Sequence, residues 1–247
     1  MATELLKQPI RITGHSCQWI VALAVAFQMA VSRAPAQNAE AKAASAAATG
    51  ESKTAALTPD QALQRLLEGN QRYVAGKPAH PDQTPERRLE LTKGQAPFAI
   101  VLTCSDSRVS PELFFDQGLG DLFVIRNAGN LLDDHVIGSM EYAVEHLHAS
   151  LIVVVGHGKC GAVSAAVGGG EIPGHIRSIA EAIMPAVEEA KNLPGDKVDN
   201  AVRANAQRMA TILTHVDPIL KTEAHEGRLK IVAARYDLST GQVEMLK

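Results

Sequence analysis

Two short stretches of the sequence place side chains that could bind a metal next to side chains that could orient a reacting group. The first, CSDSR, brings Cys104, Asp106 and Arg108 within five residues. The second, HGKC, spaces His157 and Cys160 so that both can reach one ion from a single turn. Two thiolates and one imidazole are typical zinc ligands, and three protein ligands leave a fourth position for water or substrate. This pattern predicts a catalytic zinc site.

The same cysteines are also compatible with simpler roles. Cys104 and Cys160 could form a disulfide or remain as buried, unreactive thiols. A thiol in a loop beside an arginine resembles the nucleophile of a phosphatase loop, but position 110 is serine rather than arginine. A zinc deaminase would need a His-x-Glu motif before Pro-Cys-x-x-Cys, and the sequence lacks it. Neither the disulfide nor the unreactive thiols account for His157.

Four short apolar runs indicate the strands that must position these residues. They are FAIVLT from Phe98, LFVIR from Leu122, LIVVVG from Leu151 and LKIVAAR from Leu229. Their apolarity is continuous rather than alternating, which indicates strands covered on both faces. Helical patterns separate the runs, so we expect an α/β fold with a mainly parallel sheet flanked by helices, and QVEML near the end as a final antiparallel strand. CSDSR and HGKC follow two of these runs, where such sheets collect reactive groups.

The amino-terminal part differs in composition from the rest of the chain. Lys7 and Arg11 precede an apolar stretch, and small residues follow around Ala36, so residues 1–36 are predicted to be a signal peptide. A membrane anchor is the alternative, but the stretch is shorter than the roughly 20 residues that a spanning helix needs. We expect residues 37–57 to be an Ala-rich linker and 58–247 the folded domain, in a secreted, periplasmic protein without membrane association after cleavage.

Composition limits the classes of partner. The chain has 247 residues, of which 46% are hydrophobic and 21% charged, as is typical of a globular protein. Its net charge of −3 gives no reason to expect a nucleic-acid partner, because phosphate binding needs clustered Lys and Arg. Small ligands and other proteins remain as partners.

Taken together, CSDSR and HGKC resemble the motifs of β-class carbonic anhydrases. The resemblance continues through FDQGLGDLFVIRNAGN from Phe115 and GSMEYAVEHL from Gly138, and covers most of the chain from about Leu57. It implies a β-carbonic anhydrase-like fold and a zinc lyase, or carbonate dehydratase, that hydrates CO2 reversibly to bicarbonate and a proton by attack of a zinc-bound hydroxide. It also implies one Zn2+ per chain and self-association as a dimer or tetramer.

The resemblance assigns roles to the residues of the two motifs. It implies that Cys104, His157 and Cys160 hold the zinc. It also implies that Asp106 and Arg108 form an ion pair beside it, in which Asp106 accepts a hydrogen bond from the hydroxide. Arg108 would keep the carboxylate ionised and turned away from the metal. In a closed state at lower pH, Asp106 would itself become the fourth zinc ligand.

A CO2 pocket is also implied, built across a dimer interface from Gln95, Phe123 and Tyr142. Gln95 would donate a hydrogen bond to a substrate oxygen. The simpler alternatives are that Phe123 is ordinary core, Tyr142 a helix-packing residue and Gln95 a loop residue. The resemblance further places Arg126 and Asn127, in VIRNAGN, near the active site as polar support.

Two other functions remain open at this point. The first keeps the fold and the metal but takes CS2 or COS as substrate, because an activated water attacks any such linear electrophile. The second is a non-catalytic, zinc-stabilised binding module with a permanent fourth ligand. The presence of both Asp106 and Arg108 argues against the second.

Overall fold

The computed structural model describes residues 57–247, beginning just before helix α1 (Pro59–Val74). The predicted signal peptide, 1–36, and all but the last residue of the predicted linker, 37–57, lie outside the described residues. Thr58 caps α1: its hydroxyl accepts a hydrogen bond from the Gln61 N–H, and the Gln61 side chain accepts one from the Thr58 N–H. This reciprocal cap satisfies two N–H groups that a helix start otherwise leaves unpaired.

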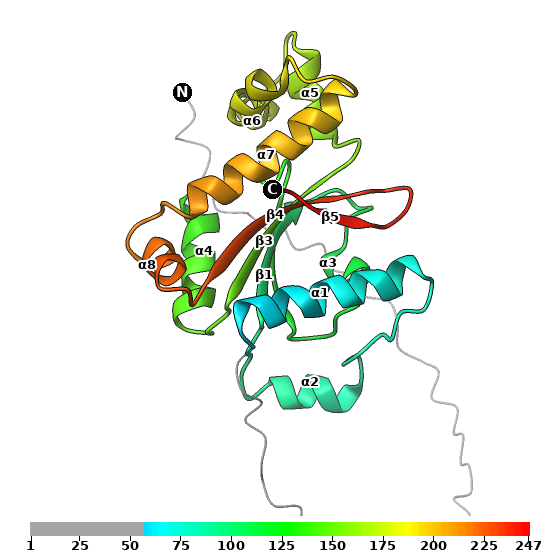
Figure 1. Cartoon of the computed structure of the whole chain (residues 1–247), viewed down its shortest axis with the longest axis vertical. Coiled ribbons are helices and arrows are strands. Elements are labelled where there is room, and N and C mark those ends of the chain that lie inside the picture. The colour runs from blue at the N-terminus through cyan, green and yellow to red at the C-terminus, as the bar shows by residue number, and fades with distance from the viewer. Residues whose placement is uncertain (1–56) are drawn as a thin grey trace, which may run out of the picture. The chain divides into compact units, whose positions relative to one another are not determined.

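A five-stranded sheet forms the centre of the described chain (Figure 1). Its strands are β1 (Ala99–Cys104), β2 (Leu122–Asn127), β3 (Leu151–His157), β4 (Lys230–Tyr236) and β5 (Val243–Met245). Their order is β2-β1-β3-β4-β5; the first four pair in parallel, and β5 pairs with β4 antiparallel. The predicted mainly parallel sheet and its antiparallel final strand are confirmed.

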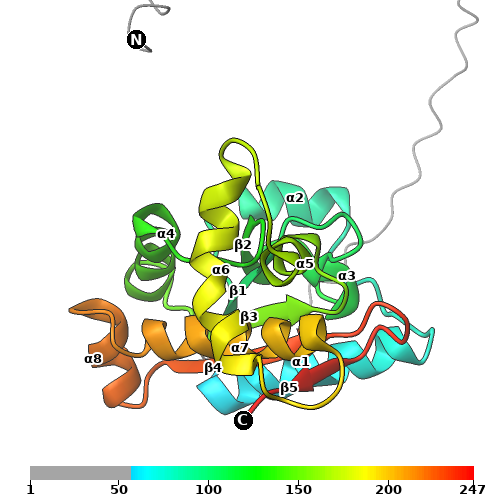
Figure 2. The ribbon, with the colours of Figure 1, turned by 90° about the horizontal axis from the view of Figure 1, so that it is seen from above.

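Helices cover both faces of this sheet. Besides α1, they are α2 (Pro85–Leu91), α3 (Pro111–Phe114), α4 (Asp134–Glu145), α5 (Gly161–Gly168), α6 (Ile176–Ala190), α7 (Lys197–Leu213) and α8 (Ile219–His225). On one face, α4, α7 and α8 pack Met140, Met209 and Leu220 onto the strands. On the other face, α1 and α3 pack Leu66 and Phe114 (Figure 2). None of the helices within 57–247 has the length and apolarity that crossing a membrane requires.

The expectation that every apolar run is covered on both faces holds for only some strands. Every residue of β1 and β3 is buried, whereas β2 is half-buried along most of its length. The reason is position, because β2 forms one edge of the sheet and has a neighbour on one side only. The first half of β4 is also only half-buried, since β5 pairs with Ala234, Arg235 and Tyr236 alone.

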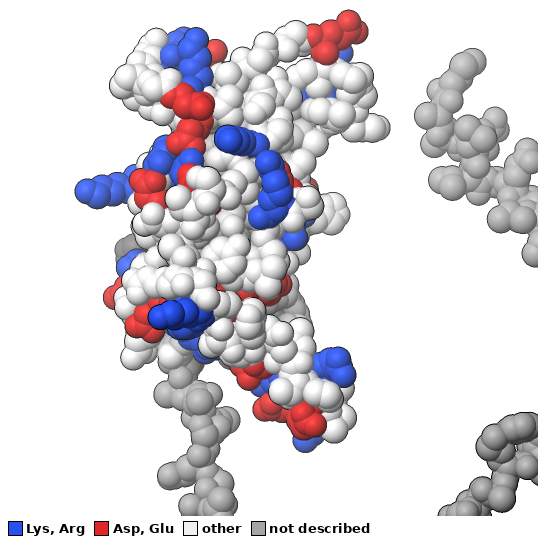
Figure 3. Space-filling view, turned by 90° about the vertical axis from the view of Figure 1, so that its right-hand side faces the viewer, with Lys and Arg blue, Asp and Glu red and all other residues white. Residues whose placement is uncertain are grey.

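The surface carries charges of both signs. On the face that Figure 3 shows, basic and acidic side chains are interspersed with uncharged ones. The expectation that no nucleic acid binds stays a prediction from the net charge.

Helix α7 comes unusually close to the carboxyl end of β3, at Gly156. A Cβ atom at this position would lie 2.9 Å from Val202 Cγ1 and 3.1 Å from the Val202 carbonyl oxygen. Glycine therefore lets the helix pack directly against the strand one residue before His157. This close packing fixes how near α7 lies to the carboxyl end of β3.

We predict that Gly156→Ala lowers the free energy of unfolding by about 1–3 kcal/mol, because the added methyl group overpacks the contact with Val202. Urea denaturation of the full chain measures this change. The matched control is Gly168→Ala at the end of α5, where a Cβ atom meets no other atom within 4 Å. Equal losses of stability in the two variants would contradict the assignment of this contact.

Candidate metal centre

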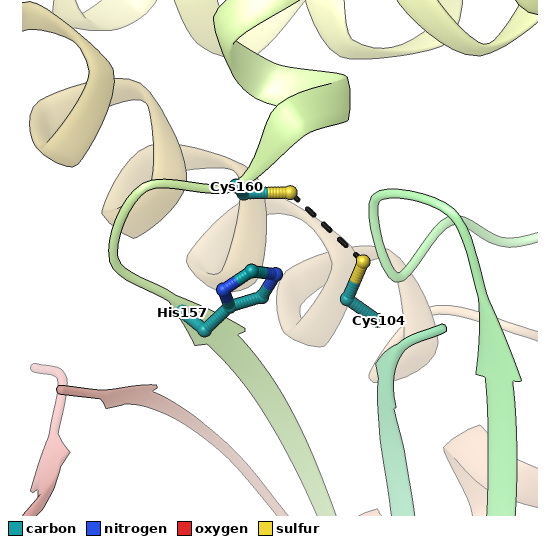
Figure 4. A group of neighbouring side chains, drawn as sticks. All are labelled: Cys104, His157 and Cys160. Atoms are coloured by element: carbon teal, nitrogen blue, oxygen red, sulfur yellow. Dashed lines mark hydrogen bonds between the residues drawn. The ribbon is translucent and has the colours of Figure 1, made fainter. Parts of the chain in front are cut away.

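The three predicted metal ligands converge at the carboxyl end of the sheet (Figure 4). Cys104 is the last residue of β1, His157 is the last residue of β3, and Cys160 caps the amino end of α5. Because β1 and β3 are neighbouring parallel strands, the three ligand atoms all lie within 4.8 Å of one another. All three residues are buried, and the two cysteines share an apolar cluster with Val163 of α5 and Ile183 of α6.

The donor atoms fit a metal ion better than they fit one another. The Sγ atoms of Cys104 and Cys160 are 4.0 Å apart and both cysteines are free, so the structure contains no disulfide between them. Two sulfurs bound to one tetrahedral zinc at about 2.3 Å each would be about 3.8 Å apart. His157 Nδ1 lies 3.0 Å from the Gly158 carbonyl oxygen, whereas the buried Nε2 has no hydrogen-bond partner within residues 57–247. With its proton on Nδ1, His157 offers the Nε2 lone pair as a metal ligand.

The turn that joins His157 to Cys160 bends at a residue other than glycine. Lys159 adopts the left-handed backbone conformation, with φ at 54°. Gly158 instead anchors the turn, since its N–H donates to the Tyr236 carbonyl at 3.0 Å. A Cβ atom on Gly161 would meet nothing within 4 Å, so that position needs no glycine for space.

The two thiols have unequal proton affinities. The hydrogen bond with Cys160 lowers the pKa of the Cys104 thiol to about 4, with smaller contributions from His157 and from the Gly129 N–H. The neighbouring Cys104 raises the pKa of Cys160 above its usual range. One sulfur is thus a thiolate that the other stabilises. A cation between them would favour deprotonation of both.

Asp106 and Arg108 form a two-point ion pair beside the ligand cluster. Arg108 Nε donates to Asp106 Oδ1 at 2.9 Å, and Arg108 Nη2 donates to Asp106 Oδ2 at 2.6 Å. The Asp106 Oδ2 atom lies 3.9 Å from His157 Nε2. The hydrogen bonds from Arg108 hold the pKa of Asp106 well below its usual range. The predicted pair is therefore assembled within reach of the position that a metal ion would occupy.

Backbone carbonyls hold the loops that carry these groups. Arg108 Nη2 also donates to the Lys159 carbonyl at 3.3 Å and so connects the two motifs. Arg126 donates to the Cys104 carbonyl at 3.1 Å and to the Asp106 carbonyl at 2.7 Å. The polar support expected from Arg126 is thus a clamp on the loop after β1. The sequence contains the residue but no signal for its two acceptors.

Asn127 and Asn205 support the loop that follows β2. The Asn127 side chain donates to the Leu131 carbonyl at 2.8 Å and accepts from the Leu131 N–H at 2.7 Å. Asn205 of α7 donates to the Gly129 carbonyl at 2.9 Å, and the Gly129 N–H points to Cys104 Sγ at 3.5 Å. Asn205 belongs to neither of the two sequence motifs. Its only signal in the sequence is an amide on the otherwise apolar buried stripe of a helix.

The three predicted pocket residues do not join the metal cluster of their own chain. Gln95 is exposed ahead of β1, and Phe123 pairs with Ile100, so both lie toward the amino ends of the strands, opposite Cys104. Phe123 is half-buried and packs against the core. Tyr142 is 48% exposed on α4, with its ring 5.2 Å from that of His146.

Comparisons with known proteins agree with the geometry. The family model described as carbonic anhydrase matches residues 99–243, which include both motifs. Carbonic anhydrase 2 of Mycobacterium tuberculosis is 41% identical over 188 residues, covering 74% of this chain and 91% of that protein. The carbonic anhydrase of Mycolicibacterium smegmatis is 42% identical over 191 residues, covering 76% of this chain and 93% of that protein.

Solved structures show the same fold. A tetrameric β-carbonic anhydrase from Sordaria macrospora superposes with a TM-score of 0.62 and 27% identity, covering 74% of this chain and 96% of that one. The Coccomyxa β-carbonic anhydrase, solved in complex with acetazolamide, gives a TM-score of 0.60 and 28% identity over 74% of this chain and 86% of that one. Fold, family model and relatives agree, and the chain therefore belongs to the β-class carbonic anhydrases.

Proposed function

We propose that this carbonic anhydrase hydrates CO2 with one Zn2+ held by Cys104, His157 and Cys160. The observation that carries the proposal is the unpartnered, buried Nε2 of His157 beside two free thiols. When bound, Zn2+ lowers the pKa of water from about 15.7 to near 7, and so supplies a nucleophile for CO2 at neutral pH. Burial of the three ligands by α5 and α6 strengthens this electrostatic effect, because it keeps bulk water away.

The role of Asp106 in this proposal is orientation. Its carboxylate accepts a hydrogen bond from the attacking group and so turns a lone pair toward the substrate carbon. The unperturbed pKa of an aspartate is about 3.9, so Asp106 would be ionised at neutral pH even without help. The contribution of Arg108 at neutral pH is therefore geometric. Its two parallel hydrogen bonds fix which way the carboxylate faces.

The same geometry supports a closed state. The Asp106 Oδ2 atom, 3.9 Å from His157 Nε2, needs only a short movement to become a metal ligand and exclude water. Arg108 opposes this movement by holding both carboxylate oxygens, and the Lys159 carbonyl in turn holds Arg108. We propose that the ion pair keeps the fourth metal position free.

A second copy of the chain is the proposed source of the CO2 pocket. Gln95 and Tyr142 are exposed and Phe123 is half-buried on the edge strand β2, away from their own metal cluster. The Sordaria relative is described as tetrameric. We propose a dimer, or a tetramer built from two such dimers, in which these three residues approach the partner's site.

Export is a further part of the proposal. The basic and then apolar composition of residues 1–36 supports a cleaved signal peptide, followed by the Ala-rich linker and the enzyme domain from residue 58. The enzyme would then act in the periplasm. The amino-terminal residue of the exported protein tests this assignment.

We predict that the full chain binds about one Zn2+ per chain and that removing the ion with a chelator abolishes CO2 hydration and lowers the Tm. The Tm falls because three buried ligands lose their common partner. Elemental analysis, stopped-flow hydration and calorimetry measure these effects.

The matched control for the zinc experiment is Asp106→Asn, which removes a carboxylate beside the cluster but no ligand. We expect this variant to keep its zinc while kcat falls about 10²-fold, because the attacking group loses its orientation. Stoichiometric zinc in the wild type without CO2 hydration would overturn the proposal. Turnover of CS2 by that protein would then identify the alternative substrate.

A third prediction separates orientation by Arg108 from its charge. Arg108→Lys keeps the positive charge but loses the two parallel hydrogen bonds to Asp106. We expect kcat at neutral pH to fall at least tenfold, nearly as far as in Arg108→Ala. The matched control is Arg228→Lys, which breaks a similar two-point pair with Glu223 on the surface of α8 and should leave kcat unchanged. Activity in Arg108→Lys close to that of the wild type would show that charge alone suffices.

A fourth prediction tests whether the pocket crosses between copies. Gln95→Ala and Asp106→Asn chains, each inactive or impaired alone, are co-expressed with different tags and the mixed dimer is purified. If Gln95 serves the partner, one of the two sites receives both native residues, and about half of the wild-type activity returns. If Gln95 serves its own chain, both sites stay defective and no activity returns.

A further inference from the structure

A backbone N–H next to Cys104 needs something to hold it in place. The Gly129 N–H points to Cys104 Sγ at 3.5 Å. Gly129 adopts φ of 81°, in the left-handed region, and a Cβ atom there would lie 2.9 Å from Ile183 Cδ1. Glycine has more backbone freedom than any other residue, so its own conformation does not fix this N–H. The direction of the N–H therefore depends on what anchors the adjoining peptide groups.

Asn205 supplies that anchor from the other side of the site. It lies on α7 at 1% exposure, and its Nδ2 donates to the Gly129 carbonyl at 2.9 Å. The neighbouring buried positions of α7 include Val202, Ala206 and Met209, all apolar. Burying an amide costs free energy unless its polar atoms are paired. A polar residue on this stripe therefore needs a reason beyond packing, and its one bonded partner is Gly129.

The pairing of this amide is incomplete, which argues against a role in stability alone. The Oδ1 atom of Asn205 is buried with no hydrogen-bond partner among the described residues, as is Nδ2 of Asn130, the residue after Gly129. Each such orphaned atom costs roughly 1–3 kcal/mol. An apolar side chain at 205 would remove the cost of Asn205 Oδ1 but would leave the Gly129 carbonyl without its side-chain donor. What the amide adds beyond packing is therefore its hydrogen bond to Gly129.

The two thiols also differ in what supports them. Cys160 lies at the amino end of α5, where the backbone N–H groups of Ala162 and Val163 reach its sulfur. Cys104 ends a strand and has no helix of its own to stabilise it. The Gly129 N–H is the larger of two backbone contributions at its sulfur, the other coming from the Asp106 N–H. Cys104 therefore relies on the contact from the Gly129 N–H, and α7 holds Gly129 through Asn205.

We propose that Asn205 is a positioning residue for the metal centre: by holding the Gly129 carbonyl, it aims the Gly129 N–H at the sulfur that Cys104 offers to zinc. The inference rests on the proposed zinc function. A hydrogen bond to a ligating thiolate stabilises its charge and fixes its orientation, and losing such outer contacts typically weakens metal binding 10–100-fold. Asn205 touches neither substrate nor metal, so its effect reaches the site only through Gly129.

The test compares zinc affinity in Asn205→Ala and Met209→Ala, using the full chain and competition with a chelator at one fixed pH. Met209 lies one turn further along α7 and is also buried, but it makes no polar contact with the loop after β2. We expect both variants to lower the Tm. Only Asn205→Ala should weaken zinc binding at least tenfold and change the sulfur-to-metal charge-transfer band of the cobalt-substituted protein.

A second variant keeps the test decisive if Asn205→Ala does not fold. Asn205→Leu has the same number and branching of side-chain heavy atoms but lacks the N–H donor, and we expect the same loss of zinc affinity. Zinc affinity in either folded Asn205 variant within twofold of the wild type, or an equal loss in Met209→Ala, would overturn the inference. Failure of the wild type to bind zinc would instead overturn the proposed function, so the two failures are distinguishable.

Discussion

The parallel pairing of β1 with β3 is the constraint on which the rest of the site depends. Parallel neighbours end at the same edge of a sheet, so a residue at the end of β1 and one at the end of β3 must lie close together. This places Cys104 beside His157, although 52 residues separate them in sequence. The tight turn then brings Cys160 to the same point at the start of α5. Any shift of register between the two strands would separate the ligands.

Backbone groups, held by side chains from elsewhere, keep the loops of this site in place. Arg126 clamps the carbonyls on either side of Ser105, and Arg108 connects its own loop to the turn after β3 through the Lys159 carbonyl. The close contact of α7 with Gly156 fixes the position of α7 along the sheet, and Asn205 of α7 donates to Gly129 in the loop after β2. Side chains from β2, from the loop after β1 and from α7 thus share the work of holding the backbone of the site. Such preorganisation spares the reaction the cost of ordering these groups.

The ion pair is built within a single chain, whereas the predicted pocket residues are not brought to the metal cluster of their own chain. Asp106 and Arg108 are neighbours in sequence, and one chain suffices to build their geometry. Gln95, Phe123 and Tyr142 lie toward the opposite end or on the surface, and one chain leaves them apart from the metal cluster. The buried Cys-His-Cys group and the exposed Gln95 and Tyr142 therefore place different demands on the chain, and the proposed self-association addresses only the second.

The sequence by itself determined the strands, the parallel class of the sheet and the Cys-His-Cys group that could hold a metal ion, because continuous apolar runs and closely spaced Cys and His residues are local signals. It misjudged the burial of β2, since strand order decides which strand forms an edge. It also missed Asn205 and the acceptors of Arg126. Those contacts join residues far apart in sequence through backbone atoms, which every residue possesses, so only the tertiary structure could decide which carbonyl or N–H each side chain meets.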